Sequence, residues 1–124
     1  MSHIYFIMPV GSDPQYELKR EQLTQLSNDA GREFFLPLER HNSFSISEAR
    51  TDLLNASLVV ADLSLERPSC YFELGIAQAL GVPVCVIAAV DTILHQTGSS
   101  IIPLFYSNLF QYREVVRKCI ASAG

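Results

Sequence analysis

The sequence predicts an α/β fold in which helices cover both faces of a five-stranded parallel sheet. Apolar runs of strand length alternate with amphipathic segments of helix length along all 124 residues. Two of the runs, 3–10 and 82–90, are almost continuously apolar, as is typical of parallel strands covered on both faces. At this length we expect a single domain, residues 1–124, with a core of its own.

The first strand is expected over residues 3–10 and is followed by a turn at 11–12. Asp13 and Pro14 form a good pair for the N-cap and first position of a helix, which Gly31 can end. The face of this helix that we expect to be buried holds Tyr16, Leu23, Leu26 and Ala30.

The second strand is expected over residues 32–36, and Pro37 begins a polar loop. Ser45 and Glu48 fit a capping box, so we expect a second helix from there to about Asn55. The third strand follows directly, over residues 57–63.

A third helix follows Pro68 and ends before Gly81, and the fourth strand is expected over 82–90. Residues 91–100 would form a lid or a subunit contact. Pro103 favours a fifth strand, 101–106, that is short or at an edge. The last helix carries one apolar stripe: Leu109, Tyr112, Val116, Cys119 and Ile120. This alternation predicts a flavodoxin-like three-layer sandwich with strand order 2-1-3-4-5.

Glu73 is the one carboxylate of the third helix, and we expect it in the first turn. There the positive end of the helix dipole favours the carboxylate form, which suits a nucleophile. Glu73 would flank the buried stripe. The alternative is that it only complements the helix dipole. The expected stripe consists of Phe72, Ile76, Ala79 and Leu80.

The predicted strand order places a ligand crevice between the first and third strands, where their carboxyl ends meet. Gly11 and Ser12 would face Asp62 and Ser64 across this crevice. Backbone N–H groups at the glycine-serine turn could hold a phosphate, although such turns are usually only structural.

Composition excludes several classes of function. A net charge of -4 provides no basic surface for nucleic acid or an anionic membrane, so we expect a small-molecule or protein partner. Cys70, Cys85 and Cys119 lie in apolar patterns as expected for free thiols, which favours the cytoplasm.

No cofactor is expected, because the sequence contains neither GxGxxG nor GxxxxGK[ST]. No metal site is expected either. The spacing of His3, His41 and His95 does not suit metal ligands, and a catalytic triad of Ser12 and Asp62 would require a histidine at the crevice.

The central segment carries a resemblance to a known family. Asp62 to Ser64, then Pro68 followed by Tyr71-Phe-Glu73-Leu-Gly and later Gly81-Val-Pro-Val, resembles the core motif of the nucleoside 2-deoxyribosyltransferase-like superfamily. The opening Tyr5-Phe-Ile with Pro9 resembles that family's first strand and ligand-binding loop. Ser64 and the run from Ser69 to Leu74 are similar, more weakly, to the glutamate-bearing segment of TIR domains, some of which cleave NAD.

The resemblance implies an enzyme that cleaves an N-glycosidic bond of a nucleoside, nucleotide or NAD-like substrate. Glu73 would be the nucleophile, and Asp62 would provide a proton or hydrogen bond to the leaving base. Asp62 is equally consistent with a loop-capping residue. Tyr5 and Tyr71 would stack on a base, although rings beside a helix start more often belong to the core.

The sequence also departs from the deoxyribosyltransferase pattern. The family has a further acid before the nucleophile's helix, where this chain has Glu66, Arg67 and Pro68 without a secure match. A second acid precedes the third strand, for which Glu48 and Asp52 are the candidates. Hydrolysis is therefore better supported than base exchange.

The resemblance further implies a homo-oligomer, at least a dimer, because enzymes of this group complete their sites from an adjacent subunit. Aromatic residues around Tyr71 and Phe110 offer surface for such a contact. The alternative function is a non-catalytic domain that senses a nucleotide or self-assembles as TIR domains do.

Overall fold

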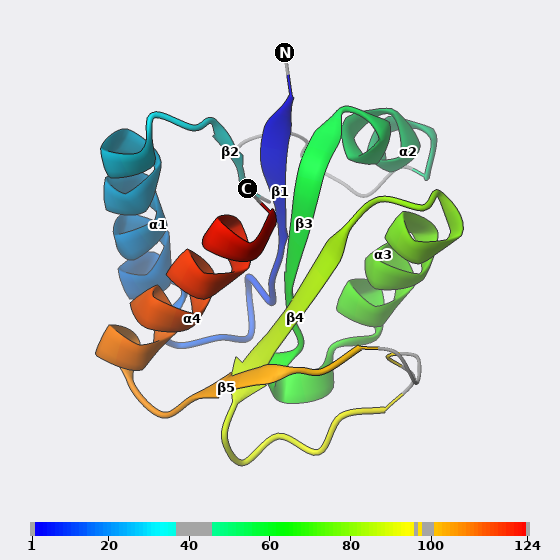
Figure 1. Cartoon of the computed structure of the whole chain (residues 1–124). Coiled ribbons are helices and arrows are strands. Elements are labelled where there is room, and N and C mark those ends of the chain that lie inside the picture. The colour runs from blue at the N-terminus through cyan, green and yellow to red at the C-terminus, as the bar shows by residue number, and fades with distance from the viewer. Residues whose placement is uncertain (1, 37–45, 96, 98–100, 124) are drawn as a thin grey trace.

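The computed structural model describes residues 2–36, 46–95, 97 and 101–123, and it has the predicted five-stranded parallel sheet of order β2-β1-β3-β4-β5 (Figure 1). The strands are β1 His3–Ile7, β2 Phe34–Phe35, β3 Ala56–Asp62, β4 Val84–Ala89 and β5 Leu104–Tyr106. The helices are α1 Tyr16–Ala30, α2 Ile46–Leu54, α3 Pro68–Ala79 and α4 Leu109–Ala123, with a 3-10 turn, η2, at Ser64–Glu66. The predicted capping residue Ser45, the loop that begins at Pro37 and the stretch 98–100 lie outside the described residues.

The helices form two layers, because α1 and α4 cover one face of the sheet and α2 and α3 cover the other (Figure 1). Side chains along β1 alternate between two cores. Ile4 and Phe6 pack with α1 and α4, whereas Tyr5 and Ile7 pack with α2 and α3. The predicted flavodoxin-like sandwich is confirmed.

The short edge strand is confirmed as well. Strand β5 has three residues, follows Pro103 and pairs only with β4. All pairings are parallel, and β1 and β3 match with Tyr5 opposite Val59 and Ile7 opposite Ala61. The carboxyl ends of β1 and β3 therefore lie at one edge of the sheet, where the loops around Gly11 and Asp62 begin.

The expectation of three free thiols is wrong for two of them. Cys85 of β4 and Cys119 of α4 form a disulfide, with 5.9 Å between their Cα atoms, and only Cys70 is free. The pairing arises because α4 packs on β4 and brings together sulfurs that are 34 residues apart. Disulfides are typical of oxidising compartments, so the cysteines no longer support the predicted cytoplasmic location. Within the described residues, no helix has the length and apolar character to cross a membrane.

Aromatic side chains remain on the surface of two helices. Phe72 of α3 is 50% exposed and Phe110 of α4 is 72% exposed, whereas Tyr112 is buried. Exposed rings of this kind are consistent with a protein contact. The predicted oligomer stays a prediction.

Candidate functional site

Glu73 lies in the second turn of α3, not in the first as predicted. The helix begins at Pro68, whose fixed φ suits the first helical position, and no acidic residue lies in its first turn. Since the effect of the helix dipole fades beyond that turn, the dipole does not explain the charge of Glu73.

The buried face of α3 also differs from the predicted stripe. Cys70, Leu74 and Ala77 are buried, while Phe72 points outward. Helix α3 is apolar on nearly every side, so hydrophobic periodicity alone did not identify its inner face. Glu73 nevertheless lies beside the buried face, and its side chain is half-buried, at the margin of the core.

Tyr5 holds the Glu73 carboxylate. Its hydroxyl donates a hydrogen bond of 2.6 Å to Oε2 of Glu73, and Tyr5 itself is only 2% exposed. The Tyr5 ring stacks on Phe35, with 5.8 Å between ring centroids, and base stacking by Tyr5 stays a prediction. The phenol orients a carboxylate through a charge-assisted hydrogen bond.

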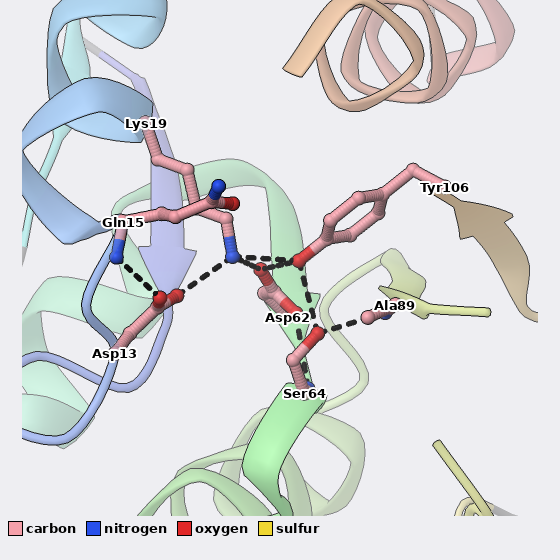
Figure 2. Close-up of polar contacts among 7 residues, drawn as sticks. All are labelled: Asp13, Gln15, Lys19, Asp62, Ser64, Ala89 and Tyr106. Carbon is pink, nitrogen blue, oxygen red and sulfur yellow. Dashed lines mark hydrogen bonds and ion pairs between the residues drawn. The ribbon is translucent and has the colours of Figure 1, made fainter. Parts of the chain in front are cut away.

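A second group of polar side chains lies on the other face of the sheet. We call Asp13, Lys19, Asp62, Ser64 and Tyr106 the lysine cluster (Figure 2). The Lys19 ammonium lies 2.6 Å from Oδ2 of Asp13, 3.4 Å from Oδ2 of Asp62 and 2.8 Å from the Tyr106 hydroxyl. Lys19 is only 3% exposed, so three acceptors replace water around its charge.

Asp62 is an acceptor in this cluster. It accepts hydrogen bonds from Lys19, from the Tyr106 hydroxyl at 2.7 Å and from the Ser64 backbone N–H at 3.0 Å. Asp62 extends from β3 toward α1, whereas Glu73 contacts β1 from the α2 and α3 layer. Proton donation by Asp62 stays a prediction, and one that this geometry does not favour.

Ser64 is a buried member of the lysine cluster. Its hydroxyl is 2.9 Å from the Tyr106 hydroxyl and accepts a hydrogen bond of 2.8 Å from the backbone N–H of Ala89. Substrate contact by Ser64 stays a prediction, although only 4% of the residue is exposed.

The cluster shifts the pKa values of Lys19 and Tyr106. Burial alone lowers the pKa of Lys19, but the charge of Asp62 and the hydrogen bonds to Asp13 and Tyr106 outweigh it, so the pKa lies above the ordinary lysine value. Burial and the charge of Asp62 raise the pKa of Tyr106. On the other face, burial and then the charges of Glu73 and Asp62 raise the pKa of the Cys70 thiol to about 12.

The turn after β1 is open to solvent. Gly11 and Ser12 are exposed and Pro9 is buried. A side chain added at Gly11 would meet no atom within 4 Å. Asp13 directs Oδ1 to the backbone N–H of Gln15 at 2.8 Å, so one donor at the start of α1 is already occupied. Phosphate binding at this turn, and ligand contact by Pro9, stay predictions.

Tyr71 links α3 to the segment after β4. Its hydroxyl donates to Oε1 of Glu66 at 3.1 Å and accepts from the backbone N–H of His95 at 3.0 Å. Nδ1 of His95 lies 2.5 Å from the same Glu66 oxygen. Tyr71 is half-buried. Base stacking by its ring stays a prediction.

Sequence reasoning missed Lys19 and Tyr106. Lys19 lies three residues after Tyr16 and four before Leu23, on the stripe expected to be buried. A lysine in that position indicates a buried ion pair, and this signal was available in the sequence. The described residues bring together no group of three or more His, Cys, Asp or Glu side chains that suits a metal ion.

Comparisons with solved structures identify proteins of the same fold. The chain is similar to a CMP N-glycosidase of Clostridium botulinum, at 15% identity over 92% of this chain and 98% of that chain, with a TM-score of 0.66. It is similar to a 2-deoxyribosyltransferase of Bacillus psychrosaccharolyticus, at 21% identity over 90% of each chain, with a TM-score of 0.62. A TIR domain of a Toll-related receptor of Hydra magnipapillata aligns over 99% of this chain and 98% of that chain, at 12% identity and a TM-score of 0.74.

No protein-family model matches the sequence, and no curated protein matches it. At such low identities the structural likenesses establish the fold and not the activity. The chain therefore has the fold of a CMP N-glycosidase, a 2-deoxyribosyltransferase and a TIR domain, as the resemblance of its central segment predicted.

Proposed function

We propose that this protein cleaves the N-glycosidic bond of a nucleoside, nucleotide or NAD-like substrate, with Glu73 as the nucleophile. One observation carries the proposal: the half-buried Glu73 carboxylate is held at 2.6 Å by the hydroxyl of the buried Tyr5. A carboxylate fixed in this way is oriented before substrate arrives. The folds of the N-glycosidase and the deoxyribosyltransferase support the reaction class.

The reaction breaks the bond between C1′ of the sugar and a nitrogen of the base. As that bond lengthens, positive charge develops on the sugar, and a carboxylate beneath the ring stabilises it. An oxygen of Glu73 then bonds to C1′, and the base departs with the electron pair of the broken bond. Water attacks C1′ in the second step, which breaks the bond from C1′ to Glu73, releases the sugar and restores the carboxylate. The proton that water loses balances the proton that the departed base takes up.

Tyr5 has a defined part in this scheme. It donates to Oε2 of Glu73 and would orient the carboxylate so that one of its oxygens can approach C1′. Since Tyr5 is fixed by β1 and by its stacking on Phe35, the carboxylate has one preferred orientation. Such positioning accounts for a substantial share of catalysis by a covalent nucleophile.

The direct experiment is incubation with cytidine, cytidine monophosphate, 2′-deoxynucleosides and NAD, followed by chromatography for free base. The Glu73→Gln variant should lose base release by about a thousandfold or more, because an amide is a poor nucleophile at carbon. Folding should be unchanged, since the two side chains are nearly isosteric.

Glu114→Gln is the matched control, because Glu114 lies on α4 and pairs with Arg117 away from Glu73. This variant should keep full activity. A folded Glu73→Gln variant that releases base at the wild-type rate would overturn the role of Glu73. Absence of release from every substrate by the wild-type protein would overturn the enzyme assignment for this panel.

A second candidate function rests on the outer face of α3. That face forms an apolar groove of about 610 Å³, lined by Pro68, Tyr71, Phe72, Gly75, Ile76 and Ala79. An exposed apolar surface of this kind suits contact with another protein. Binding of a nucleotide without base release, together with self-association detected by light scattering, would favour a TIR-like assembly domain.

A further inference from the structure

We propose that the lysine cluster positions the loops that border the predicted ligand crevice: Lys19 fixes the turn after β1 against the ends of β3 and β5. The cluster thereby sets the shape of the loops that follow β1 and β3 in the ligand-free protein. The kinetic part of this inference rests on the proposed function, whereas the structural part is independent of it.

The contacts of the cluster form an unbroken path across the edge of the sheet (Figure 2). Asp13, directly after the Gly11–Ser12 turn, binds Lys19 of α1. Lys19 and Asp62 both bind the Tyr106 hydroxyl at the end of β5. Ser64 continues the path from Tyr106 to the last residue of β4. Segments up to 93 residues apart in the chain, from Asp13 to Tyr106, are joined by side chains alone.

The buried charges of the cluster fix one arrangement of the turn more than they stabilise the fold. Two carboxylates face one ammonium, and all three side chains are at most 6% exposed. Withdrawing such charges from water costs free energy that the ion pairs recover only when every partner is in place. An apolar cluster of similar size would stabilise the fold equally well. What the ion pairs add is a single arrangement, because any other position of the turn leaves a buried charge without its partner.

Lys19 does not reach a ligand in this arrangement. Its three ammonium protons match the three acceptors Asp13, Asp62 and Tyr106. The rings of Tyr106 and Tyr112 lie 5.0 and 5.4 Å from Nζ and close off the remaining side. Lys19 is therefore a positioning residue and not a substrate-binding one.

Tyr106→Phe is the most selective test, because it removes one hydroxyl from the path and leaves both ion pairs. Tyr112→Phe is the matched control. The Tyr112 ring also faces Lys19, but its buried hydroxyl has no hydrogen-bond partner among the described residues. Lys19→Met removes the ammonium and, if it folds, should have a larger effect of the same kind.

Amide hydrogen exchange of the ligand-free proteins gives the first readout. In Tyr106→Phe, exchange of residues 11–15 and 62–66 should rise by about tenfold or more, while residues 58–61 inside β3 change little. Tyr112→Phe should leave both regions unchanged. Unchanged exchange at 11–15, or an equal rise throughout the protein, would overturn the inference, since the latter is the result of lost stability alone.

Kinetics give the second readout where the protein releases base. If the loops after β1 and β3 are no longer fixed, KM should rise by about tenfold in Tyr106→Phe, while kcat stays within about a factor of two. An equal fall in kcat would instead place the cluster in the chemical step and contradict a positioning role. If no substrate is turned over, the proposed function fails, but the exchange measurement still decides this inference.

Discussion

The side chain of Tyr5 is buried between β1 and the layer of α2 and α3, yet the carboxylate that it binds lies at the margin of the core. This pairing changes the interpretation of both residues. Tyr5, expected to stack on a base, donates a hydrogen bond to Glu73 and stacks on Phe35. Glu73, expected in the first turn of its helix, lies in the second turn and accepts a hydrogen bond from a phenol of another element.

The first prediction at this scale concerns Tyr5→Phe. The variant keeps the ring and its stacking on Phe35 but removes the donor to Glu73, so kcat for base release should fall by about tenfold or more. KM should change little, because the hydroxyl is buried and would act through the Glu73 carboxylate.

A double variant separates a direct role from an indirect one. If Tyr5 acts only through the carboxylate, then Tyr5→Phe should cause no further loss in a Glu73→Gln background. Additive losses in kcat would show that Tyr5 acts on the reaction independently of Glu73.

At the scale of elements, the turn between β1 and α1 would form one side of the predicted crevice. Gly11 has open space where a side chain would begin, so a substitution there disturbs no packing. The turn is also tied down by Asp13, two residues later, through Lys19 and Gln15. A substitution at Gly11 therefore tests ligand access without disturbing the fold.

Gly11→Val should weaken binding of cytidine monophosphate by about tenfold relative to binding of cytidine, if backbone N–H groups of the turn hold the phosphate. Isothermal titration of both ligands measures the two affinities. Ser12→Ala serves as a control that keeps the backbone donors. Equal losses for the two ligands in Gly11→Val would show that the turn has no role in phosphate binding.

The elements also show where sequence reasoning succeeded and where it failed. Alternating apolar and amphipathic segments predicted the sequence of strands and helices and hence the fold, because those features follow from local patterns. The inner face of α3 was misassigned because apolar residues lie on nearly every side of this helix. The Cys85–Cys119 pair and the Tyr5–Glu73 contact join segments 34 and 68 residues apart, so only the packed structure brings them together.

The lysine cluster was predictable from the sequence only in part. Lys19 on an apolar stripe indicated a buried partner, but the sequence did not name Tyr106, which lies 87 residues away. Asp62 was correctly placed at the end of β3, yet its side chain faces α1 and not Glu73. Alternation along a strand predicts which residues share a face, but it does not predict which helix layer covers that face.

At the scale of the whole molecule, several buried acidic groups keep their protons longer in the folded protein than in the unfolded chain. Burial raises the pKa of Cys70 to about 12, and it raises the pKa values of Tyr106 and Tyr112 as well. In the unfolded chain a cysteine titrates at about 8.5 and a tyrosine at about 10. Above those values the unfolded chain binds fewer protons than the folded protein, so the free energy of unfolding falls as pH rises.

Cys70 provides the sharpest test of this alkaline sensitivity, since its thiol begins to titrate in the unfolded chain at a lower pH than the tyrosines. Urea denaturation of the wild-type protein and of Cys70→Ala should be compared at pH 7, 9 and 10 in reducing buffer, so that Cys85 and Cys119 are thiols in both proteins. The contribution of Cys70 is fully present below about pH 8.5 and should decline by about 1.4 kcal/mol per pH unit above it. The difference in unfolding free energy between the two proteins should therefore stay constant up to about pH 8.5 and then shift in favour of Cys70→Ala. A difference that stays constant through pH 10 would mean that the Cys70 thiol ionises as readily in the folded protein as in the unfolded chain, and that its burial against Leu74 and Ala77 of α3 does not persist in solution.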